Sequence, residues 1–161
     1  MRALKTNVNY PNDQLVWVAL EAIGGAIRDL HQPRGRAIVT DVFGEQVKDI
    51  YATDTSDQLL EVTEDLIGAA FVLAQTWITA TRKKALSATA ENVLHVANYW
   101  KHRDTWDVNW IPGKNRIEAG TIAAVRALGA APPTVLRQLT SLAEAALKQR
   151  FSVEALWAAI S

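Results

Sequence analysis

The stretch that decides the fold runs from residue 55 to residue 84, TSDQLLEVTEDLIGAAFVLAQTWITATRKK. Its apolar side chains recur at steps of three and four residues, which places them along one side of an α-helix. They are Leu59, Val62, Leu66, Ala69, Ala70, Leu73, Trp77 and Ala80. Thr55 to Gln58 has the spacing of a capping box, and the basic residues Arg82 to Lys84 suit the negative end of a helix dipole. The pattern predicts one uninterrupted helix, the scaffold of the fold.

The rest of the chain also has helical periodicity, and almost nothing in it alternates as a strand would. A first helix is expected to open at Pro11 and Asn12 or Asp13 and to run to Leu30, and a second one carries Phe43 to Tyr51 after Thr40. Others are expected over 89–102, from Asn115 to Leu128, from Pro132 and Pro133 onward, and over 153–160 after Ser152. Short connections favour helices that pack antiparallel or steeply crossed. The sequence therefore predicts an all-α fold, a single-domain bundle of about six or seven helices over residues 1–161, with 1–10 as a polar N-terminal segment.

Composition excludes several classes of protein. The 161 residues include 17 basic and 17 acidic ones, so no overall positive field attracts nucleic acid or an anionic membrane. The absence of cysteine excludes disulfides, thiolate zinc sites and a cysteine nucleophile. No apolar run reaches the roughly 20 residues of a membrane span, and the N-terminus lacks the apolar core of a secretory signal. We therefore expect a soluble cytoplasmic protein of bacterial type that binds neither nucleic acid nor membrane.

Unusual side chains gather on the predicted helix 89–103 and in the loop 104–113 that follows it. The apolar stripe of this helix carries Val93, Val96, Ala97 and Trp100. A second, polar stripe carries Glu91, His95, Asn98, Tyr99 and His102. Such a stripe either lines a pocket or forms the solvated face of an amphipathic helix. The loop adds Trp106 and Trp110, which either cap the open end of the core or line a binding site.

These observations favour a binding module over an enzyme, with no cofactor. The face formed by helix 89–103 and loop 104–113 would bind a protein partner or a small ligand. We expect the protein itself to be a homodimer. The candidate ligand- or partner-binding residues are His95, Tyr99, His102, Arg103, Trp106 and Trp110.

Residues 97–106, ANYWKHRDTW, resemble a segment of the form AN-aromatic-x-KHRD-x-W found in uncharacterised bacterial all-helical proteins. The similarity covers about ten residues, and it implies a helical fold of the kind that periodicity already predicts. Because no activity is assigned to the segment, the resemblance transfers no function.

A weaker similarity concerns the HEPN class of helical ribonucleases, whose hallmark is an arginine followed four to six residues later by a histidine. The resemblance implies a general base at His102 and a stabiliser of phosphate charge at Arg103, supplied by two copies across a dimer. The chain departs from this pattern, since Arg103 directly follows His102 and Arg28 precedes His31 by only three residues. A HEPN-like ribonuclease is thus an alternative function, with His102 and Arg103 as its candidate catalytic residues.

Metal-dependent phosphohydrolysis is the other enzymatic alternative. Glu61 and Glu64 resemble the first half of the paired E-x-x-E and E-x-x-D motifs of all-α nucleotide pyrophosphatases. The second half is missing, since Leu94 stands where a carboxylate is needed. Glu61, Glu64, Glu91 and His95 are the candidate ligands. Acidic residues near a helix start also suit the helix dipole, so we expect no resident metal.

Overall fold

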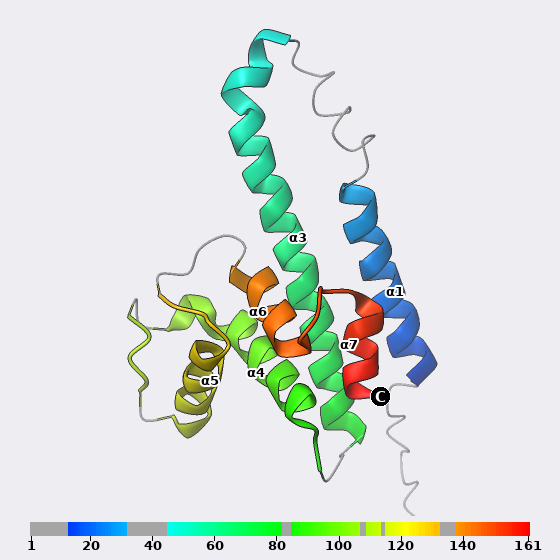
Figure 1. The fold of residues 1–161 in the computed structure, drawn as a ribbon, viewed down its shortest axis with the longest axis vertical. Helices are drawn as coiled ribbons and strands as arrows, with labels where there is room; N and C mark the ends of the chain where they lie inside the picture. Colours follow the sequence, from blue (N-terminus) through cyan, green and yellow to red (C-terminus); the bar gives the residue numbers. More distant parts are fainter. Residues whose placement is uncertain (1–12, 32–44, 82–84, 107–108, 114, 133–137) are drawn as a thin grey trace, which may run out of the picture.

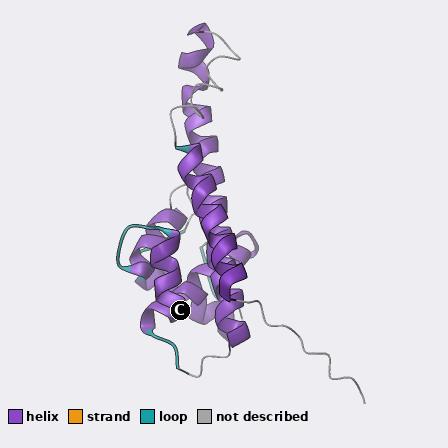
Figure 2. Ribbon diagram, turned by 90° about the vertical axis from the view of Figure 1, so that its right-hand side faces the viewer, coloured by secondary structure: helices purple, strands orange, loops and turns teal. Residues whose placement is uncertain are grey.

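The computed structural model describes residues 13–31, 45–81, 85–106, 109–113, 115–132 and 138–161 (Figure 1). These residues form six α-helices and a short 3-10 helix, with no strand among them, which confirms the all-α prediction (Figure 2). The elements are α1 (Asp13–Leu30), α3 (Glu45–Thr81), α4 (Ala88–His102), η1 (Arg103–Thr105), α5 (Arg116–Ala127), α6 (Gln138–Leu147) and α7 (Val153–Ile160). Within the described residues, we find no helix that has both the length and the apolar character to span a membrane.

Helix α3 is the scaffold, because α1, α4, α6 and α7 all pack on it. Its buried side differs from the stripe predicted from the sequence: Ile67, Phe71, Ala74 and Ile78 are almost completely buried, whereas Val62 and Ala69 of the predicted stripe are exposed. The chain runs up along α1 and back down along α3, so that these two helices are antiparallel (Figure 1). The N-terminal turns of α3 extend beyond the end of α1.

The start of the long helix was predicted wrongly. The sequence suggested a short helix with Val47, Ile50 and Tyr51, then a new helix after the capping box at Thr55. Instead α3 is continuous from Glu45 to Thr81. A capping residue contributes only about 1 kcal/mol, and no proline or glycine interrupts the chain near Thr55, so the helix continues through this weak signal. Thr40, Phe43 and the residues from Arg82 to Lys84 lie outside the described part of the chain.

Most of the other predicted helix boundaries are confirmed where they can be compared. Helix α1 ends at Leu30, and α7 covers Val153–Ile160. Asn115 caps α5 by accepting a hydrogen bond from Ile117 N, and Ser152 caps α7 by accepting one from Ala155 N. Gly129 has a φ of 100°, a left-handed conformation typical of the glycine that ends a helix. Of the two prolines predicted to start the sixth helix, Pro132 is not helical and Pro133 lies outside the described residues.

The apolar seam of α6 faces the inside of the bundle. Leu139, Leu142 and Ala146 are each no more than 1% exposed. Within the described residues, the role of this seam is to close the core against α3, α4 and α7.

Candidate functional site

The polar stripe predicted on α4 is largely covered by other elements. Tyr99 is only 1% exposed. Asn98 Oδ1 accepts a 2.8 Å hydrogen bond from Gln75 Nε2 of α3, and His95 is half-buried. Glu91 and His102 are the exposed members of the stripe. The stripe is therefore neither one continuous solvated face nor the lining of one pocket, because its middle packs against neighbouring elements.

Tyr99 is the centre of an aromatic cluster with the two loop tryptophans. Its ring centroid lies 5.6 Å from that of Trp106 and 5.6 Å from that of Trp110, and the two indoles are also 5.6 Å apart. All three pairs are tilted or edge-to-face, the arrangement that aromatic rings prefer. The Tyr99 hydroxyl accepts a 2.9 Å hydrogen bond from Gln138 Nε2 of α6, so the buried phenol is satisfied.

The loop after η1 closes the end of the core between α4 and α5. Trp110 is 2% exposed and has a φ of 53°, a left-handed conformation unusual for a large residue. Arg126 of α5 holds this turn, because its Nη2 donates to Asn109 O at 3.0 Å and to Trp110 O at 3.3 Å. Trp110 is thus a core residue, whereas Trp106 is half-buried and keeps part of its indole at the surface.

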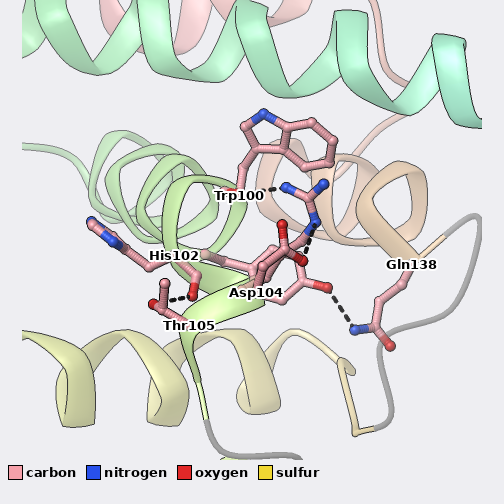
Figure 3. Close-up of polar contacts among 7 residues, drawn as sticks. Trp100, His102, Asp104, Thr105 and Gln138 are labelled. Atoms are coloured by element: carbon pink, nitrogen blue, oxygen red, sulfur yellow. Dashed lines mark hydrogen bonds and ion pairs between the residues drawn. The ribbon is translucent and has the colours of Figure 1, made fainter.

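Arg103, the first residue of η1, places its guanidinium over the indole ring of Trp100. Its Cζ is 3.5 Å from the Trp100 ring centroid, and its Nη1 donates a 2.6 Å hydrogen bond to Trp100 O (Figure 3). The Nε atom lies 3.7 Å from Asp104 Oδ1. The Arg103 side chain is 22% exposed, against 83% for Asp104. The guanidinium is therefore fixed by cation–π stacking and a backbone hydrogen bond while part of it remains open to solvent.

A glycine of α3, Gly68, leaves room for the Trp100 indole that contacts Arg103. Gly68 of α3 is buried, and a Cβ atom built on it would overlap the indole ring of Trp100. Only glycine allows the indole to lie so close to the α3 backbone. The position of Arg103 thus depends, through Trp100, on a glycine 35 residues earlier in the chain.

We call the exposed residues at this end of α4 the recognition surface. It consists of Lys101, His102, Asp104 and Thr105, which are exposed, and Arg103 and Trp106, which are half-buried. Thr105 Oγ1 donates a 2.8 Å hydrogen bond to His102 O, which orders the turn (Figure 3). Lys101 and Arg103 are the cationic side chains of this surface, so it suits a negatively charged group, while the His102 imidazole points away from Trp100 (Figure 3).

His95 lies one turn before Tyr99, and its surroundings disfavour the charged imidazolium. Burial lowers the pKa of His95 from its usual value near 6.5, and the nearby Glu91 carboxylate opposes that shift. Its Nδ1 is buried and has no hydrogen-bond partner within the described residues. A half-buried neutral imidazole between α4 and its neighbours is a structural element rather than part of the recognition surface.

The lowered pKa of His95 predicts that acid destabilises the fold. In the unfolded chain His95 takes up a proton near pH 6.5, whereas in the folded chain it does so only at lower pH. The unfolded state thus binds more protons in this window, and the free energy of unfolding should fall as the pH decreases below about 6.5. Urea titrations from pH 8 to pH 5 would measure this, with His95→Gln as the comparison because it removes the titrating group. An identical pH dependence in both proteins would contradict the assignment.

The candidate metal ligands are not brought together. Glu64 is 7% exposed, and its Oε1 accepts hydrogen bonds from Thr140 N at 3.0 Å and Thr140 Oγ1 at 3.2 Å. This carboxylate thereby satisfies a backbone N–H in the first turn of α6, where the helix dipole favours negative charge. Glu61 and Glu91 are exposed on different helices. Across the described part of the chain, no group of three histidine, aspartate or glutamate side chains is arranged to hold a metal ion.

Several residues of this region did not stand out in the sequence. Gln138 and Arg126 reach the site from α6 and α5, and no local pattern shows that they bond to Tyr99 and to the loop backbone. Gly68 did carry a signal, because a glycine in the middle of a long helix usually has a packing or functional reason. A mid-helix glycine indicates that something packs closely against position 68, but it does not indicate which residue does, here Trp100.

Comparisons of the chain with models of protein families, with curated proteins and with solved structures find no match.

Proposed function

We propose that the protein is a binding protein without catalytic activity, and that its recognition surface receives an acidic group of a partner. The observation that carries the proposal is the fixed position of the Arg103 guanidinium, stacked on Trp100 at 3.5 Å and still partly exposed. A free arginine carries about 2 kcal/mol of side-chain rotamer entropy. Because the stack already restricts this side chain, little of that entropy remains to be lost on binding.

The chemistry of the guanidinium supports an oxyanion as the bound group. Arginine has five N–H donors in a planar fork that matches a carboxylate or a phosphate. One of its nitrogens donates to Trp100 O, and the contact of Nε with the exposed Asp104 is long at 3.7 Å. An exposed ion pair of this kind contributes only about 0–1 kcal/mol, so an acidic group of a partner can replace Asp104. Lys101 would add attraction at the rim.

The proposal predicts that arginine, and not merely positive charge, is needed at position 103. In Arg103→Lys the positive charge remains, but the contact of the guanidinium with the Trp100 ring and its fork of N–H donors are lost. We expect about tenfold weaker binding of a fluorescein-labelled hexaglutamate peptide, corresponding to about 1.4 kcal/mol. Fluorescence anisotropy at low salt measures the affinity, and a hexaglutamine peptide shows how much binding does not depend on charge.

Arg150→Lys is the matched control, because Arg150 is an exposed arginine in the connection between α6 and α7. It should bind the peptide as the unaltered protein does. Equal losses in both variants would show that only overall charge matters. The ribonuclease alternative is tested on the same samples with single-stranded RNA. Cleavage that disappears in both His102→Ala and Arg103→Ala would replace the binding function with a catalytic one.

A further inference from the structure

Helices α1 and α3 each carry a row of exposed side chains that the other described helices leave uncovered. On α1 the exposed residues at helical spacing are Leu15, Val18, Ala22 and Asp29, and on α3 they are Val62, Asp65 and Ala69. We call these seven residues the outer face. Of the helices that the structure describes, α7 packs near Gly24 and Trp17 of α1 and α4 packs near Gly68 of α3, so neither covers the outer face. This surface is separate from the recognition surface at the end of α4.

The outer face exposes large apolar side chains. Leu15 is 66% exposed, Val18 is 54% exposed and Val62 is 45% exposed. Leu15 and Val18 are three residues apart and Ala22 follows after four more, the spacing that a partner helix covers with its own apolar stripe. Apolar side chains grouped along one helix face mark a docking surface more often than single exposed ones do.

The exposed charged side chains described on α1 and α3 are mostly negative. Among their described side chains, the exposed carboxylates are Asp13, Glu21, Asp29, Asp57, Glu61 and Asp65. The exposed cation is Arg28, whose guanidinium lies beside Gly24 and Gly25 and attracts Glu154 of α7. Because Gly25 lies between Ala22 and Asp29 in the same helical row, this guanidinium stands at the edge of the outer face. Although the whole chain has no net charge, the described exposed side chains of α1 and α3 together are negative.

We propose that the outer face docks a cationic amphipathic helix of another protein. Its apolar stripe would cover Leu15, Val18 and Val62, and its lysines or arginines would lie beside Asp29 and Asp65. A second copy of this chain is disfavoured as the occupant, because it would bring the same carboxylates against one another. Helix α1 has 18 residues, so a partner helix of similar length, about 27 Å, spans the face.

The probe is a fluorescein-labelled 18-residue peptide of lysine, leucine and alanine, ordered so that its leucines form one helical stripe. A second peptide of the same composition has the leucines spread around the helix. We expect the amphipathic peptide to bind the full chain about tenfold more tightly than the shuffled one. Leu15→Ser/Val18→Ser should remove this preference, whereas Asp29→Asn/Asp65→Asn should weaken the binding of both peptides.

Ile117→Ser is the matched control, because Ile117 is 71% exposed but lies on α5. It should leave both affinities unchanged, and circular dichroism confirms that each variant is folded. Val62→Ser repeats the test on α3 in case the double variant is unstable. Equal binding of the two peptides, or an equal loss in Ile117→Ser, overturns the proposal. So does a dimer in sedimentation velocity that Leu15→Ser/Val18→Ser converts to a monomer, since a second copy would then cover the face.

Discussion

Replacement of Trp110 by alanine is expected to lower the free energy of unfolding by about 3–5 kcal/mol, the usual cost of truncating a buried tryptophan. The indole is 2% exposed and contacts both Tyr99 and Trp106 in the aromatic cluster. Its removal would leave a cavity at the end of the core that α4, α5 and the loop share. Urea unfolding followed by circular dichroism measures the loss.

Two comparison variants separate packing from other effects at this position. Trp110→Phe keeps a ring against Tyr99 and the same backbone, so it should lose clearly less stability than the alanine variant. Trp106→Ala removes a half-buried indole and should also cost less. A stability of Trp110→Ala within about 0.5 kcal/mol of the unaltered protein, the range of ordinary surface substitutions, would show that the loop does not cap the core.

Gly68→Ala is the second substitution with a large expected effect, and it should destabilise the protein even though alanine favours helix. In an open helix position the change would contribute about 1 kcal/mol of stability. Here the added Cβ meets the Trp100 indole, over whose ring the Arg103 guanidinium also lies. Forcing extra atoms into a packed site costs about 1–3 kcal/mol, so the net result should be a loss.

Gly120→Ala provides the control for the helix preference alone. Gly120 is exposed in α5, and a Cβ there meets no atom within 4 Å. This variant should gain up to about 1 kcal/mol in urea unfolding. If Gly68→Ala were stabilised by the same amount, Trp100 would not lie against α3. Displacement of Trp100 should also release Arg103, so Gly68→Ala should weaken binding of the hexaglutamate peptide.

The helices of this protein were largely determined by its sequence. Apolar spacing predicted α7 at its observed bounds and α1 as far as its observed end at Leu30, and Asn115 and Ser152 cap the helices that they were expected to cap. These features are local, because a helix depends on residues three and four positions apart and on the groups at its ends. The exception is the capping box at Thr55, where a local signal of about 1 kcal/mol did not interrupt α3.

Only the tertiary structure decided which of the notable side chains are available for function. The same stretch of sequence holds Tyr99 and Trp110, which are buried, and His102, which is exposed. Nothing local distinguishes them, since burial depends on what packs above each side chain, here Gln138 of α6 and the loop that Arg126 holds. Arg103 likewise owes its fixed position to Gly68, a contact between residues far apart in the chain. Sequence periodicity shows which residues share a helix face, but packing between distant segments determines which faces remain open.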